Sequence, residues 1–132
     1  MEYPSDWYVW AVNGVPPDAF GYNAAIFSTF RLGSLGQHGG IPSGSAKVDV
    51  ELDRRGSSDC GSNQSDATDA VVGGVDGWRF ENRELEERDD LIAVAHGAAL
   101  DEWCFQIIGY FAPDSPYSET LEEMVASLKF GS

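Results

Sequence analysis

Basic residues are scarce in this chain, and that scarcity limits its partners. Eight Lys and Arg stand against 22 Asp and Glu, which leaves a formal net charge of −14 in 132 residues. No segment gathers the basic residues into a stripe that could follow a phosphate backbone, so nucleic acid and anionic membrane surfaces are disfavoured partners. The acidity is typical of a solvated surface, and a surface for a cationic partner is the alternative interpretation.

Long apolar runs are also missing. No run approaches the roughly 18 residues that a membrane-spanning helix needs. The opening Met1-Glu2-Tyr3 lacks the basic and apolar regions of a signal peptide. We therefore expect a soluble protein without a membrane span, either cytoplasmic or exported after removal of a leader. The length suits one domain over residues 1–132, and the closing Gly131-Ser132 is either domain sequence or a cloning remnant.

The chain has few cysteine and histidine residues, the types most often found in catalytic and metal sites. Cys60 and Cys104 fit neither a zinc cluster nor a CxxC redox pair. Two reduced thiols are the default interpretation, and a disulfide between them is the alternative. The chain has only two histidines, and it contains no G-x-S-x-G elbow, P-loop, H-E-x-x-H or dinucleotide fingerprint. We predict no catalytic residue, no metal site, no cofactor and no enzymatic activity.

Alternation and apolar composition predict about six strands, followed by a helix. The predicted strands cover residues 3–11, 23–32, 45–52, 77–82, 91–95 and 103–111. Between them, residues 66–71 are expected to form a short helix, Gly73-Gly74 a turn, and residues 96–102 a hairpin connection in which His96 caps or hydrogen-bonds the hairpin. The segment 33–44 holds five glycines and is expected to be a long surface loop.

The last segment has the period of an amphipathic helix. Ser115 suits the N-cap and Pro116 the first helical position. The apolar face carries Tyr117, Leu121, Met124, Val125 and Leu128. The polar face carries Glu119, Glu122, Glu123 and Ser127. We expect this helix to cover one sheet face, which argues against a functional site there.

Four features look familiar in combination: the opening Tyr3-Pro4-Ser5-Asp6-Trp7, the pair Gly73-Gly74, the long hairpin 91–111 and the closing segment 117–130. They resemble the PsbP-like family, named for the extrinsic subunit of the oxygen-evolving photosystem. The resemblance implies an α+β fold, an α/β/α sandwich in which an antiparallel sheet packs against helices, and a mainly non-catalytic docking or accessory role. Compared with the family, we expect the first strand, before Tyr3, to be missing or truncated, and no functional residue of the family matches a position here.

Aromatic residues near the N-terminus are the best candidates for a binding surface. Strand alternation places Tyr8 and Trp10 on the side opposite Trp7, so at least one ring is available to a partner. With Phe20 and His38 they are the predicted ligand-binding wall of a groove. The alternative is that the rings pack against the sheet and the helix.

Other candidates have simpler interpretations. His38 in the glycine-rich loop is more typical of a solvated histidine, and a nucleophilic Cys60 with His38 as its base has no family signature. The oxygen ligands Asp59, Asn63, Asp66 and Asp69 do not have calcium-loop spacing. The acidic run 84–90 is typical of a solvated face.

These observations favour a non-enzymatic binding or accessory domain that acts through a loop-side pocket or surface. Its partner is an unknown protein or small molecule. Two alternatives stay open: a small-molecule enzyme or carrier with a site at residues 33–44, and a self-associating interaction protein. The chain is accordingly a monomer or a homodimer.

Overall fold

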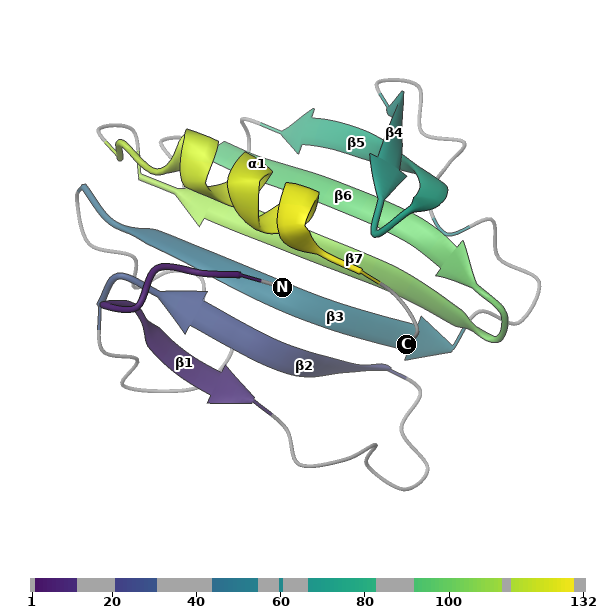
Figure 1. The fold of residues 1–132 in the computed structure, drawn as a ribbon, viewed down its shortest axis with the longest axis horizontal. Coiled ribbons are helices and arrows are strands. Elements are labelled where there is room, and N and C mark those ends of the chain that lie inside the picture. The colour runs from purple at the N-terminus through teal and green to yellow at the C-terminus, as the bar shows by residue number, and fades with distance from the viewer. Residues whose placement is uncertain are drawn as a thin grey trace.

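The computed structural model contains one antiparallel sheet of seven strands (Figure 1). It describes residues 2–11, 21–30, 44–54, 60, 67–82, 92–112 and 115–129. The strands are β1 (Tyr8–Ala11), β2 (Gly21–Ser28), β3 (Ala46–Arg54), β4 (Thr68–Val72), β5 (Val75–Asn82), β6 (Ile92–Leu100) and β7 (Trp103–Phe111). Their order in the sheet is β1-β2-β3-β7-β6-β5-β4. The long strands β3, β6 and β7 therefore form the centre, and β1 and β4 are the two edges.

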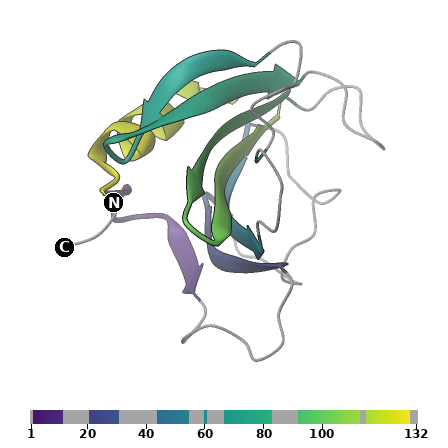
Figure 2. The same cartoon turned by 90° about the vertical axis from the view of Figure 1, so that its right-hand side faces the viewer.

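One helix, α1 (Ser118–Ser127), lies on one face of the sheet in the described part of the chain. Figure 2 shows α1 and the N-terminal segment on the same side of the curved sheet. The Trp7 and Tyr117 rings meet edge to face with centroids 5.5 Å apart, and the Glu2 amide donates to Ser127 Oγ at 2.7 Å. The N-terminal segment therefore extends the layer that α1 begins.

The main core lies between α1 and this face of the sheet. Strand alternation directs one set of apolar side chains toward the helix, among them Val48, Phe105, Ile107 and Phe111. From the helix side the core receives Leu121, Met124 and Val125. Gly109 allows the close approach of the helix, because a Cβ at this position would lie 2.8 Å from Leu121 Cδ2.

The opposite face of the sheet carries a buried polar group of residues at its centre. Lys47 Nζ lies 3.2 Å from Asp49 Oδ2, and both side chains are almost fully buried. The Lys47 ammonium also lies 5.7 Å from the centroid of the Tyr110 ring. Burial raises the pKa of Tyr110, and the charges of Asp49 and Glu51 raise it further. A disulfide joins Cys60 to Cys104 on β7.

The predicted fold class is wrong. The described residues form a β-rich structure of seven strands with one short helix, and not an α+β sandwich with helices packed on a six-stranded sheet. The segment 66–71 was predicted to be a helix, but from Thr68 on it belongs to β4, which pairs with β5 from Thr68↔Arg79 to Val72↔Val75. Gly73 and Gly74 both have positive φ, and they close this hairpin. Pairing with β5 therefore outweighs the weak local preference for a helix.

Other boundaries differ for similar reasons. The predicted connection 96–102 belongs mostly to β6, which pairs with β5 and β7 on its two sides, and the turn is confined to Asp101 and Glu102. The helix begins at Ser118 with Tyr117 as its N-cap, so the predicted start at Ser115 and Pro116 is wrong. The default interpretation of two reduced thiols is also wrong. Across the ranges given above, no helix is long and apolar enough to span a membrane.

Candidate functional site

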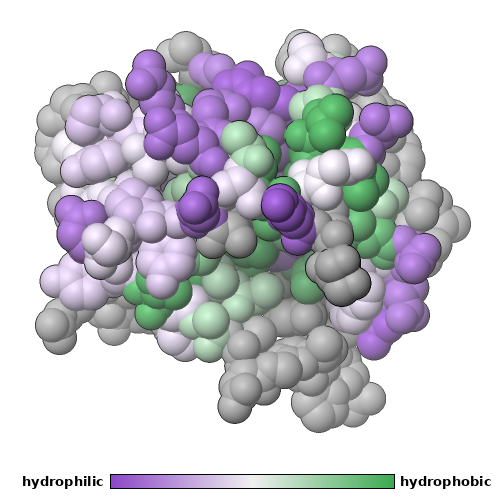
Figure 3. All heavy atoms as spheres, viewed as in Figure 1, coloured by the Kyte–Doolittle hydropathy of each residue, from purple (hydrophilic) through white to green (hydrophobic). Residues whose placement is uncertain are grey.

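A pocket of about 330 Å³ opens between the first turns of α1 and the ends of β5, β6 and β7. Its base is apolar and consists of Ile92, Val94, Phe111 and Ala112. Its rim is polar and consists of Arg79, Glu81, Ser115, Ser118, Glu119 and Glu122. Figure 3 shows hydrophilic side chains gathered over the region of α1 and β5. The pocket therefore offers an apolar floor beneath a charged mouth.

Strand and helix periods bring the charged side chains together. Arg79 and Glu81 are two residues apart on β5, so both face α1. Glu119 and Glu122 are three residues apart on α1, so they are neighbours on one side of the helix. His96 on β6 is the cross-strand partner of Arg79 and shares its face of the sheet.

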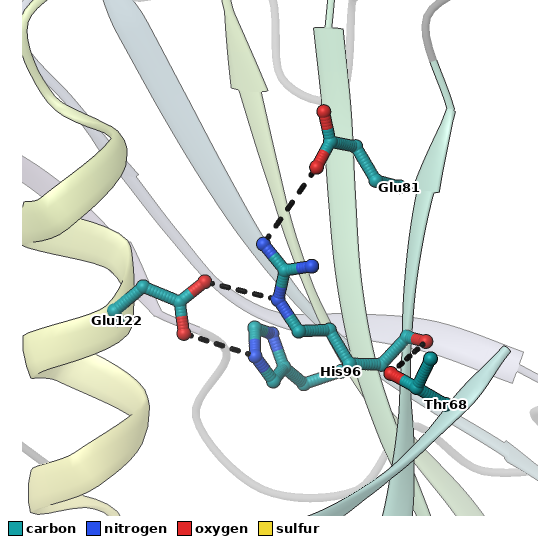
Figure 4. Close-up of polar contacts among 5 residues, drawn as sticks. Thr68, Glu81, His96 and Glu122 are labelled. Atoms are coloured by element: carbon teal, nitrogen blue, oxygen red, sulfur yellow. Dashed lines mark hydrogen bonds and ion pairs between the residues drawn. The ribbon is translucent and has the colours of Figure 1, made fainter.

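An ion-pair network joins the helix to the sheet at this pocket (Figure 4). Arg79 Nε donates to Glu122 Oε1 at 3.1 Å, and the guanidinium also lies 3.8 Å from Glu81 Oε2. The other Glu122 oxygen, Oε2, lies 3.3 Å from His96 Nε2. One carboxylate on α1 thus contacts two neighbouring strands.

His96 is buried to 3% exposure, whereas the Glu122 side chain is 47% exposed. Burial lowers the pKa of His96, the charge of Glu122 opposes this by raising it, and Arg79 lowers it. The imidazole is therefore neutral at neutral pH. Because a carboxylate only accepts hydrogen bonds, the proton belongs on Nε2. Nδ1 is buried and has no hydrogen-bond partner among the residues that the structure describes.

The rim of the pocket has an excess of negative charge. Of the described residues at the rim, Arg79 contributes +1, and Glu81, Glu119 and Glu122 together contribute −3, which leaves −2 while His96 is neutral. Arg79 contacts two of the three carboxylates. Glu119 has no ion pair with any other described residue, so its carboxylate is available to a cation that enters the pocket.

The predicted groove residues lie elsewhere. Tyr8 and Trp10 are on edge strand β1, opposite Ser28 and Ile26 of β2, and they face away from α1. Tyr8 is 46% exposed, whereas Trp7 is buried. Phe20 and His38 lie outside the described residues, as does the loop 33–43. The groove that these residues were predicted to form therefore stays a prediction.

Sequence reasoning missed the pocket because it assigned the helix-covered face to the core. Arg79 and Glu81 alternate with Trp78 and Phe80, which marks a charged side on β5. His96 interrupts an otherwise apolar strand and was interpreted as a hairpin cap. Of the oxygen ligands considered for calcium, Asp69 is on β4 and the other three lie outside the described residues. No group of three metal-ligating side chains occurs within the described ranges.

Comparisons with protein-family models, with curated proteins and with solved structures find no match to this chain. The PsbP-like resemblance therefore stays a prediction, and a functional proposal has to rest on the geometry of the pocket.

Proposed function

We propose that this chain is a non-catalytic binding domain whose pocket beside α1 binds a small amine with a short apolar portion. The observation that carries the proposal is the arrangement of three carboxylates and one guanidinium above an apolar floor. An ammonium group would lie at the mouth near Glu119 and Glu122. The apolar portion would rest on Val94 and Phe111.

The size and lining of the pocket support a small ligand. Its volume of about 330 Å³ is at the lower end of the range for small-molecule sites. Such sites combine an apolar lining with a few polar groups that fix orientation, and this pocket has both. A carboxylate and an ammonium form a charge-assisted hydrogen bond, which is stronger than a neutral one.

The charge of the whole protein also favours a cationic ligand. A net charge of −14 creates a field that raises the local concentration of cations and accelerates their association. The pocket groups suit binding better than proton transfer, because the Nε2 atom of His96 is directed at Glu122.

The test is calorimetric titration with three compounds that differ in charge: 2-phenylethylamine, the neutral 2-phenylethanol and the anionic 3-phenylpropionate. We expect the amine to bind about tenfold more tightly than the alcohol, as one charge-assisted hydrogen bond allows. The anion should bind most weakly.

Two variants of the same helix provide a matched pair. Glu119→Gln should weaken amine binding about threefold to tenfold, since the carboxylate is exposed and partly screened. Glu123→Gln removes the same charge from α1 outside the pocket and should have little effect. Equal losses in both variants, or an alcohol that binds as tightly as the amine, would contradict the proposal.

Self-association through β1 is a second candidate function. Tyr8 and Val9 lie on opposite faces of this edge strand and are 46% and 44% exposed. Edge strands offer backbone groups that can pair with another chain. Light scattering of the wild type and of Val9→Lys tests this candidate. It requires that the wild type is a dimer and that the variant is a monomer.

A further inference from the structure

We propose that protonation of His96 regulates the pocket, because a proton on its imidazole and an amine in the pocket compete for the carboxylate of Glu122. This inference rests on the proposed amine binding. It adds that affinity for the amine falls in acid and recovers at neutral pH.

The geometry places Glu122 between the two competitors. Its Oε2 lies 3.3 Å from His96 Nε2 on the sheet side, and the same side chain lines the pocket. Its Oε1 accepts from Arg79 Nε at 3.1 Å, so Arg79 already neutralises part of its charge. A second cation can therefore be added from the buried side, by His96, or from the pocket side, by the amine.

Among the residues that the structure describes, Glu122 is the only close counter-charge to His96. From β5 it faces Arg79, with Glu81 beyond the guanidinium. From β7 it faces the apolar Ile107, and β6 itself carries no other ionisable side chain. On β4, Thr68 is neutral and donates to the Arg79 carbonyl at 3.4 Å.

Two groups lie farther from the imidazole. Asp69 is opposite Trp78, on the other face of the sheet, and Glu119 is one helical turn from Glu122. Because Nδ1 has no hydrogen-bond partner among the described residues, the interaction that a proton on His96 strengthens is the one with Glu122.

The direction of the effect follows from the charge count. With neutral His96 the rim carries −2, and protonation reduces this to −1. A cation is therefore bound less tightly when His96 is protonated. Linkage is reciprocal, so a bound amine must lower the proton affinity of His96 by the same factor, and the pKa of His96 falls accordingly.

The experiment measures the dissociation constant of 2-phenylethylamine at about pH 5.5 and about pH 8, a range in which the amine stays charged as lysine does. We expect binding to be tighter at the higher pH, and the ratio to approach a typical coupling of roughly fivefold to tenfold as the lower pH falls below the pKa of His96. In His96→Gln, which lacks the titrating group, the affinity should be nearly the same at both values.

A second measurement uses the wild type alone and does not depend on folding of the variant. The imidazole signal of His96 is followed by NMR through a pH titration, with and without saturating amine. We expect the amine to lower the pKa of His96. The chain has only two histidines, and the His96 signal is the one with nuclear Overhauser contacts to Ile107, its cross-strand neighbour.

The outcomes separate the two proposals. Amine binding that is independent of pH, with an unchanged pKa of His96, would overturn the regulation and leave the binding function intact. Equal pH dependence in the wild type and in His96→Gln would also overturn it. Absence of amine binding at both pH values would contradict the binding function itself, and the regulation with it.

Discussion

His96 Nε2 on β6 lies 3.3 Å from Glu122 Oε2 on α1, so a buried side chain of the sheet is paired with a half-exposed side chain of the helix. This contact joins the middle of the sheet to the only helix in the described part of the chain. The charge of this imidazole therefore acts directly on a contact between α1 and the sheet.

Stability should depend on pH through His96. Its pKa is below 6.5 in the folded state, mainly because the side chain is buried. The pKa of His96 is 6.5 in the unfolded chain and lower in the folded chain. Between these two pKa values, the unfolded chain binds a proton that the folded chain does not. The stabilisation by neutral His96 is thus present above this window and is lost as the pH falls through it.

Urea denaturation at several pH values within that window measures the effect. The wild type should lose more stability than His96→Gln between neutral and mildly acidic pH. Because the carboxylates are shared by both proteins, the difference between the two curves isolates His96. Parallel curves would show that the imidazole does not titrate in this way.

Removal of the disulfide should destabilise the protein. Cys60 and Cys104 are 44 residues apart, and closing a loop of this length stabilises a fold by about 2–4 kcal/mol. The double variant Cys60→Ala/Cys104→Ala should unfold at a correspondingly lower urea concentration. A reducing agent should shift the wild-type transition and leave that of the double variant in place. A wild-type transition that does not respond to reduction would contradict the bond.

The buried pair on the other face of the sheet should show strong non-additivity. Lys47→Met leaves the Asp49 carboxylate buried without its ammonium partner, which costs about 3–5 kcal/mol. The double variant Lys47→Met/Asp49→Leu removes both charges and should be more stable than Lys47→Met. Chemical denaturation of four proteins measures this: the wild type, the single variants Lys47→Met and Asp49→Leu, and the double variant. A double variant whose loss equals the sum of the two single losses would mean that the pair does not interact.

Local patterns predict the elements whose residues repeat regularly, and they fail where long-range pairing decides. The C-terminal helix follows from its apolar stripe. The segment 66–71 has no clear period, and only the contact with β5 makes its residues from Thr68 on part of a strand. Likewise, Gly97 and Ala98 have weak strand preference, yet both are held between β5 and β7. The distance between Cys60 and Cys104 depends on the fold and is invisible in their sequence spacing.

The pocket could be predicted only in part, for a related reason. The apolar stripe shows that α1 covers the sheet, but it does not show how completely. α1 begins at Ser118, and the pocket lies beside its first turn, next to Phe111. Glu119 and Glu122 border the stripe and appear in the sequence as solvated residues. The structure shows that Glu122 instead contacts Arg79 and His96 of the sheet, which its sequence context does not indicate.

The most direct test of the account is an NMR titration of the protein with 2-phenylethylamine near neutral pH. We predict saturable shifts of the Glu119 and Glu122 amides and of the Arg79 side-chain Nε–H, all of which are weakened in Glu119→Gln. The signals of Tyr8 and Trp10 on β1 should stay in place. Shifts confined to β1, or no saturable shift at α1, would contradict the claim that the pocket beside α1 is the binding site.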